Sequence, residues 1–111
     1  MGASQEDTVY LVLEDFGSFG KAYRETDPSQ ADRQTVLSNL LSGEYKRPLR
    51  IVAFNTTEGW ARDVSQVVAW EVVRRAEKEG KWLVQGTYQF VVFHTGKDDA
   101  LPVENSLLQA T

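Results

Sequence analysis

The sequence predicts a small α/β domain with the order β-α-β-α, in which a sheet of two strands, or three, packs with three to four helices. Two apolar runs rich in β-formers, residues 9–13 and 49–54, are typical of buried strands. A segment with helical periodicity separates them, and a longer one follows the second run. Two strands joined through a helix favour parallel pairing with a right-handed crossover.

The length and composition are those of one globular domain. The chain has 111 residues, of which 41% are hydrophobic and 25% charged. A chain of this size can bury a core without disulfide or metal support. We expect one domain at residues 8–95, with flexible tails at 1–7 and 96–111.

Charge and cysteine content exclude several classes of function. Sixteen acidic and twelve basic side chains give a net charge of −4, which argues against a nucleic-acid-binding protein. The absence of cysteine removes disulfides, thiol catalysis and thiolate metal sites, and it fits a reducing compartment. No apolar run approaches the roughly 20 residues that span a bilayer, and the first residues lack the features of a signal peptide. We expect a cytoplasmic protein without a membrane partner.

The first strand stops at Glu14 and Asp15. Beyond it, Phe16, Phe19 and Tyr23 recur at helical spacing, although two glycines in the same stretch weaken a helix by about 1 kcal/mol each. We predict a glycine-rich loop that leads into one or two helical turns at residues 19–25. Helix and loop both stay open for residues 16–26.

A helix is predicted at residues 28–42. Asp27 is a suitable N-cap, and Pro28 would occupy the first helical position. One apolar stripe follows at helical spacing, made by Ala31, Val36, Leu37, Leu40 and Leu41. Gly43 would end the helix as a left-handed C-cap.

Three basic residues, Lys46, Arg47 and Arg50, stand at the entrance of the second strand. Such a trio is usually solvated surface, and we favour that interpretation over an anion site. The strand itself is predicted at residues 49–54.

The stretch 55–62 is the best candidate for a ligand site. We predict that it forms a polar elbow between the second strand and a long helix, which begins near Asp63 and ends at Gly80. Strand-to-helix connections are where parallel α/β sheets place ligands, and helix N-termini bind anions. The candidate ligand-binding residues are Asn55, Thr56, Thr57, Glu58, Trp60 and Arg62. The favoured alternative is structural: turn capping, a packed tryptophan and an ion-paired arginine.

Residues 86–94 fit two structures. The run 86–93 is dense in β-formers, so propensity favours a strand. As a helix, the same residues would bring Tyr88, Val91 and Val92 onto one face.

Several segments resemble a known family. The similar residues are 12–17, 20–27, 32–36, 41–45 and above all 50–65, which contains Phe54-Asn55-Thr56-Thr57-Glu58-Gly59-Trp60. They resemble small, uncharacterised single-domain bacterial proteins, most of them alphaproteobacterial, over about residues 9–94. The resemblance implies no reaction, cofactor or partner. It does imply that residues 88–94 are helical, and we prefer the helix for that reason, although Val92 and Phe93 stand where the family has polar residues.

The remaining chemistry-bearing residues have structural interpretations. Adjacent carboxylates on a strand point to opposite sides, so Glu14 and Asp15 are expected to pair with a cation such as Arg24 or Arg62. His94 is the only histidine and has no accompanying ligand cluster, so we expect no metal site, no cofactor and no catalytic residue.

Aromatic residues suggest another kind of function. The three tryptophans, Trp60, Trp70 and Trp82, are most simply core and rim residues. With Phe90, Val92 and Phe93 they could instead form an exposed aromatic patch for a protein partner or a second copy of the chain. A non-enzymatic protein-interaction or self-associating module is therefore our first hypothesis. The alternative is a regulatory domain that binds a small ligand or anion at residues 55–63. An enzyme is least favoured, because no nucleophile, base and acid can be assembled from the sequence.

Overall fold

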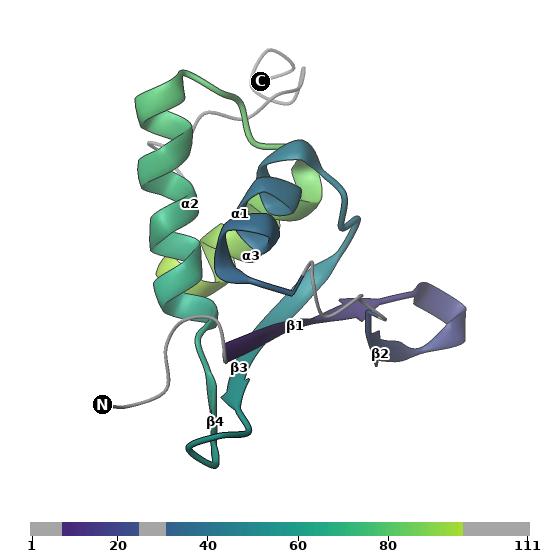
Figure 1. Ribbon diagram of the computed structural model, residues 1–111. Helices are drawn as coiled ribbons and strands as arrows, with labels where there is room; N and C mark the ends of the chain where they lie inside the picture. The colour runs from purple at the N-terminus through teal and green to yellow at the C-terminus, as the bar shows by residue number, and fades with distance from the viewer. Residues whose placement is uncertain (1–7, 25–30, 97–111) are drawn as a thin grey trace.

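Four strands and three α-helices form the protein in a computed structural model that describes residues 8–24 and 31–96. One antiparallel sheet has the order β2-β1-β3-β4, from β1 (Thr8–Asp15), β2 (Lys21–Tyr23), β3 (Pro48–Asn55) and β4 (Trp60–Asp63). The helices α1 (Arg33–Ser42), α2 (Ser65–Glu79) and α3 (Gln85–Thr95) gather on one side of it (Figure 1). The α/β class is confirmed, but the sheet has four strands and not two or three. Of the predicted tails 1–7 and 96–111, all but residue 96 lies outside the described residues.

The two central strands, β1 and β3, run antiparallel, so the predicted parallel pairing is wrong. Tyr10 lies opposite Ala53 in their ladder. The chain reverses direction once more than expected, because β2 folds back antiparallel on β1. The backbone N–H of Arg24, just after β2, extends this pairing by donating to the carbonyl of Val12. The N–H of Tyr10 donates to the carbonyl of Ala31, which places the start of α1 beside the start of β1. Helix α1 returns the chain to the end of β1, so β3 must run the opposite way.

A tight hairpin replaces the helical turns expected at residues 19–25, of which residue 25 lies outside the described range. Residues 17–19 form one 3-10 turn, η2 (Gly17–Phe19), and β2 follows at once. Gly17 and Gly20 have φ angles of 70° and 92°, which residues with a Cβ rarely adopt. The carboxylate of Asp15 accepts a 2.8 Å hydrogen bond from the N–H of Gly17. The glycines that weaken a helix therefore close this hairpin.

The predicted elbow is the turn of a second hairpin, which corrects the direct strand-to-helix connection. Asn55 pairs with Trp60 and Phe54 with Ala61, so residues 60–63 form the edge strand β4. Gly59 has a φ of 75°, and its N–H donates to the carbonyl of Asn55 at 2.8 Å. A left-handed glycine and a polar turn are typical of a hairpin.

Helix α1 begins at Arg33, five residues later than predicted. Asp32 is the N-cap and accepts the N–H of Thr35 at 3.1 Å. The predicted cap, Asp27, and Pro28 lie outside the described residues. Gly43 ends the helix in the left-handed conformation with a φ of 83°, as predicted.

Helix α2 confirms the long helix that ends at Gly80. The N–H of its first residue, Ser65, is bound by a residue that precedes the helix: Asp63 Oδ1 accepts it at 2.8 Å. Glu71 binds Arg33 of α1, so this carboxylate joins two helices.

Helix α3 confirms the helical alternative for residues 86–94. Thr87, Phe90 and Val91 share its buried face. Thr87 Oγ1 donates to the carbonyl of Leu40 at 2.6 Å, which fixes α3 to α1. Burial against the rest of the core outweighs the β propensity of this segment.

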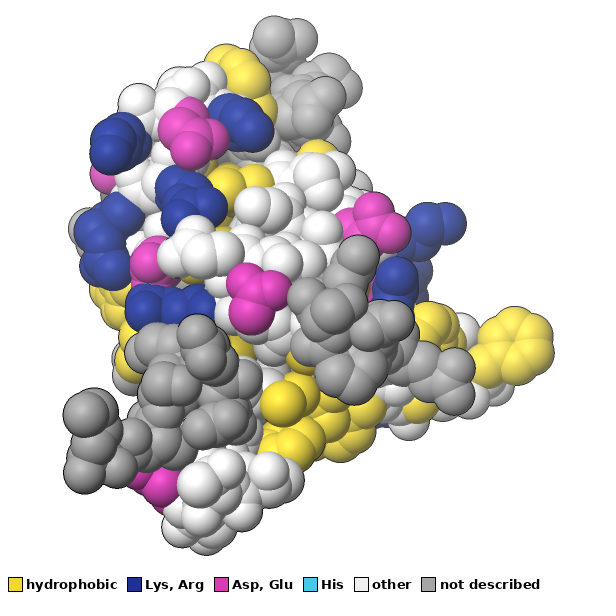
Figure 2. Space-filling view, in the orientation of Figure 1, with side chains coloured by type: hydrophobic (Ala, Val, Ile, Leu, Met, Phe, Trp, Pro, Cys, Tyr) yellow, Lys and Arg dark blue, Asp and Glu magenta, His cyan; other side chains and the backbone are white. Residues whose placement is uncertain are grey.

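The core lies between the helices and one face of the sheet. Val12 and Ile51 supply that face, and both are 2% exposed or less. Alternate residues of the same strands point the other way. We call this second surface the open sheet face; it consists of Val9, Leu11, Leu13, Val52 and Phe54, all partly exposed and none part of the core cluster. Figure 2 shows hydrophobic side chains gathered below the helices, over the sheet.

Candidate functional site

Asn55 holds the second hairpin together. Its side chain is 1% exposed. Its Oδ1 accepts the N–H of Glu58 at 2.8 Å, and its Nδ2 donates to Thr8 Oγ1 at 3.1 Å. The amide therefore closes the turn and joins β3 to β1, so its polar atoms serve the fold.

Three of the other predicted ligand residues, Glu58, Trp60 and Arg62, contact one another on the same hairpin. Trp60 Nε1 donates to Glu58 Oε1 at 2.8 Å, and the Arg62 guanidinium lies 4.4 Å from the centre of the Trp60 ring. Thr56 and Thr57 are exposed at the tip. The structure thus brings all six residues together, but without the helix N-terminus that motivated the site.

That helix N-terminus lies beyond the far end of β4. The carboxylate of Asp63 already binds the first N–H of α2 and pairs with Arg50 at 2.8 Å. Burial opposes ionisation of Asp63, but hydrogen bonds from Ser65 and Arg50 outweigh it, so the pKa lies below its usual value. An anion at residues 55–63 stays a prediction without support from this helix.

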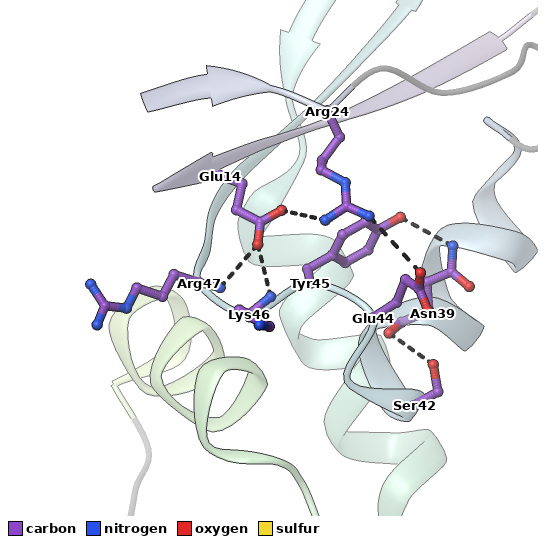
Figure 3. Close-up of polar contacts among 8 residues, drawn as sticks. All are labelled: Glu14, Arg24, Asn39, Ser42, Glu44, Tyr45, Lys46 and Arg47. Carbon is purple, nitrogen blue, oxygen red and sulfur yellow. Dashed lines mark hydrogen bonds and ion pairs between the residues drawn. The ribbon is translucent and has the colours of Figure 1, made fainter. Parts of the chain in front are cut away.

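Glu14 is the most deeply buried carboxylate among the described residues, and it acts as a structural anchor. Its side chain is 3% exposed and pairs with Arg24 at 2.9 Å. Its second oxygen accepts the backbone N–H groups of Lys46 at 2.8 Å and Arg47 at 3.3 Å (Figure 3). Arg24 as the charge partner confirms the structural interpretation of this glutamate. The carboxylate fixes the connection between α1 and β3 to the end of β1.

Arg24 extends this network to the end of α1. Its guanidinium lies 5.3 Å from the centre of the Tyr45 ring and 3.9 Å from a carboxylate oxygen of Glu44 (Figure 3). Tyr45 Oη accepts a hydrogen bond from Asn39 at 3.3 Å, and burial raises the pKa of this phenol. The network therefore joins the end of α1 to the first hairpin.

His94 has a structural role in the described part of the chain. Its Nε2 lies 2.8 Å from the carbonyl oxygen of Leu49, so this nitrogen carries the proton and donates. The ring contacts Phe90 and Phe93 at centroid distances of 4.7 and 4.9 Å. Within residues 8–24 and 31–96, no three His, Cys, Asp or Glu side chains are placed to hold a metal ion.

The predicted aromatic patch does not form one surface. Phe90 is buried in the core, and Trp60 is engaged by Arg62. Trp82 and Phe93 are 54% and 73% exposed, but they lie near opposite ends of α3. Exposed aromatic side chains occur instead on the β1–β2 hairpin, where Phe19 is 92% exposed.

The open sheet face is a candidate interaction surface that the sequence did not reveal. Leu11 lies opposite Val52 and Val9 opposite Phe54, so these side chains are neighbours on one face. Both strands are apolar at nearly every position, which hides the alternation that normally separates a covered face from an exposed one. The pairing itself, which no local pattern indicates, is what identifies the surface.

Comparison of the chain with models of protein families, with curated proteins and with solved structures finds no match. The resemblance described above therefore stays a prediction. Across the described helices, none is both long and apolar enough to cross a bilayer.

Proposed function

We propose that this protein is a non-enzymatic, self-associating module in which two copies join through their open sheet faces. The observation that carries the proposal is that all three helices pack on one side of the sheet, while the other side presents five apolar side chains. Contiguous exposed apolar surface on a small domain is typical of an interaction site.

The charge on this face favours a second copy as the occupant. Arg50 and Asp63 border the apolar side chains and neutralise each other at 2.8 Å. A face without net charge can meet its own copy without repulsion, which is what the self-complementary interface of a two-fold dimer requires. Two such faces would pack about 10 Å apart, as in sheet sandwiches.

The β1–β2 hairpin enlarges this surface. Tyr23 lies opposite Leu13 on the same face and is 49% exposed. Phe16 and Phe19 follow at the tip of the hairpin, which projects from the body of the protein (Figure 1). Aromatic residues in such positions contribute strongly to interfaces.

Sedimentation equilibrium of the wild type and two lysine variants tests the proposal. Leu11→Lys places a charge at the centre of the open sheet face, and Val67→Lys is the matched control at an apolar, 59% exposed position on α2. We expect a wild-type dimer, a monomeric Leu11→Lys variant and a dimeric Val67→Lys variant. Each chain has a charge of −4, so added salt should strengthen the dimer by screening repulsion.

A wild type that stays monomeric at millimolar concentration would exclude self-association. A heterologous protein would then be the occupant of the same face. Equal disruption by both lysine variants would show that association uses a different surface.

A cytoplasmic location and bacterial origin belong to the same proposal; they are supported by the absence of cysteine and by the family resemblance.

A further inference from the structure

A cleft of about 710 Å³ lies where the end of β1, the start of β3 and helix α3 meet. This volume is within the range of small-ligand sites, roughly 300–1,000 Å³. Part of its lining is apolar and comes from three elements: Leu13 of β1, Pro48 and Leu49 of β3, and Phe90 and Phe93 of α3. An apolar group of moderate size could be buried there.

Most of the charged residues in the rest of the lining are basic, although the carboxylate of Asp15 also belongs to it and accepts the N–H of Gly17. Lys21, Lys46, Arg47 and Arg50 all line the cleft. Arg50 is paired with Asp63, but within the described residues no carboxylate lies within 4.0 Å of the other three cationic groups. This positive cluster belongs to a chain whose net charge is −4. It therefore creates a local potential opposite in sign to that of the whole protein.

Two contacts hold the basic rim in place. The backbone N–H groups of Lys46 and Arg47 are bound by the buried Glu14, and the side chain of Arg47 extends away from that carboxylate (Figure 3). At Gly86, any Cβ would overlap the carbonyl oxygen of Lys46, so the first turn of α3 lies directly against this segment. The cations are therefore presented from a fixed backbone.

The start of α3 adds a further preference for negative charge. Gln85 and Gly86 begin this helix and line the cleft, and the N-cap residue Val84 makes no side-chain hydrogen bond to the first turn. Uncapped N–H groups at a helix N-terminus favour anions. The first two residues of α3 thus line the same cleft as the three cations without an ion-pair partner in the described residues.

We propose that this cleft binds an amphiphilic anion, a carboxylate or phosphate monoester carried on an apolar body. The charged group would lie among Lys21, Lys46, Arg47 and the start of α3. The apolar body would contact Leu13, Leu49 and Phe93. The proposal does not depend on self-association.

Titrations of the full chain followed by amide chemical shifts test it with four probes: octanoate, octyl phosphate, octanol and acetate. We expect octanoate or octyl phosphate to shift the amides of Leu49, Gln85 and Gly86, and the tighter of the two identifies the preferred headgroup. Acetate lacks the apolar body and octanol lacks the charge, so both should bind at least about tenfold more weakly. Octanol binding as tightly as octanoate would overturn the proposal.

Charge reversal supplies the second arm. In the double variant Lys46→Glu/Arg47→Glu we expect octanoate affinity to fall by about tenfold or more. The control Arg74→Glu/Lys78→Glu makes the same charge change on the exposed surface of α2 and should alter the affinity less than about twofold. Equal losses in the two variants, or shifts confined to residues away from the cleft, would show that the cleft is not the site. The changed side chains are exposed, and a dispersed amide spectrum verifies that each variant is folded.

Discussion

Beyond the end of β4, the side chain of Ser65 takes the place of a strand residue and hydrogen-bonds to the backbone of Ile51 in β3. Its Oγ accepts the N–H of Ile51 at 2.8 Å and lies 3.4 Å from the carbonyl oxygen of the same residue. The backbone N–H of Val64 also donates to that carbonyl at 2.9 Å. Ser65 is 1% exposed, and its hydroxyl provides an acceptor for the backbone N–H of Ile51, which water does not reach.

Ser65→Ala should therefore destabilise the protein. The substitution leaves the N–H of Ile51 buried without a partner, which costs about 1–3 kcal/mol. Urea unfolding followed by circular dichroism measures the loss. Ser38→Ala, at an exposed position of α1, is the control and should change the free energy of unfolding by less than about 0.5 kcal/mol. Equal stability of the two variants would contradict the role of the hydroxyl.

Glu14→Gln should cost about 1–3 kcal/mol, because the neutral amide cannot replace the buried carboxylate as acceptor of Arg24 and of the N–H groups of Lys46 and Arg47 together. The new amide must also turn an NH₂ group toward either the guanidinium or the N–H groups of Lys46 and Arg47. Glu44→Gln is a matched control: it removes the other carboxylate near Arg24, which lies 3.9 Å away with a 59% exposed side chain. That exposed pair should contribute less than about 1 kcal/mol. Similar midpoints of thermal unfolding for the two variants would contradict the role of Glu14 as a structural anchor.

Gly86→Ala should destabilise the protein even though alanine favours helices by about 1 kcal/mol over glycine. The added methyl group would overlap the carbonyl of Lys46, and such overpacking typically costs about 1–3 kcal/mol. Gln89→Ala, exposed on the same helix, is the control and should leave stability nearly unchanged. Thermal unfolding of both proteins decides between the two effects. A Gly86→Ala variant at least as stable as the wild type would contradict the close approach.

Asp32 makes stability depend on pH. Hydrogen bonds from Thr35 to its carboxylate lower the pKa of Asp32 below the ordinary value of 3.8. The cap therefore stabilises the fold fully above pH 3.8, and its contribution is lost as pH falls through the lower folded pKa. At pH 7, Asp32→Ala should cost about 1 kcal/mol. The difference in unfolding free energy between wild type and variant should shrink on acidification below pH 3.8, and a difference that does not change with pH would rule out the ionised cap.

Elements defined by local signals were predictable from the sequence. Both central strands appear where the apolar runs predict them, and α2 ends at the predicted glycine. The helix at residues 86–94 could not be derived from local propensity, because its β-forming side chains become helical through burial against the rest of the core. The N-cap of α1 was placed too early, since Asp27 and Asp32 both satisfy the same local rule.

The pairing of the strands could not be predicted, and the misplaced expectations about the site follow from it. A glycine-rich segment after β1 reads equally as a weak helix or as a hairpin, and only the hairpin makes β1 and β3 antiparallel. Residues 55–62 were correctly recognised as a polar connection, yet their place in the sheet depends on that same reversal. The trio Lys46, Arg47 and Arg50 is a local signal for the basic cleft, but such trios are usually solvated surface, and the approach of Lys21 and α3 to it depends on the tertiary fold.

Leu13 belongs to both proposed surfaces, since it lies on the open sheet face and also lines the basic cleft. Occupancy of one surface would therefore be felt at the other. Thermodynamic reciprocity then fixes the relation between them: an anion that strengthens the dimer by a given factor must itself bind the dimer more tightly by the same factor. If the anion instead competes with the second chain for contact with Leu13, it must weaken the dimer by the factor by which dimerisation weakens its own binding. The concentration of one small molecule would then set the fraction of chains that are dimeric.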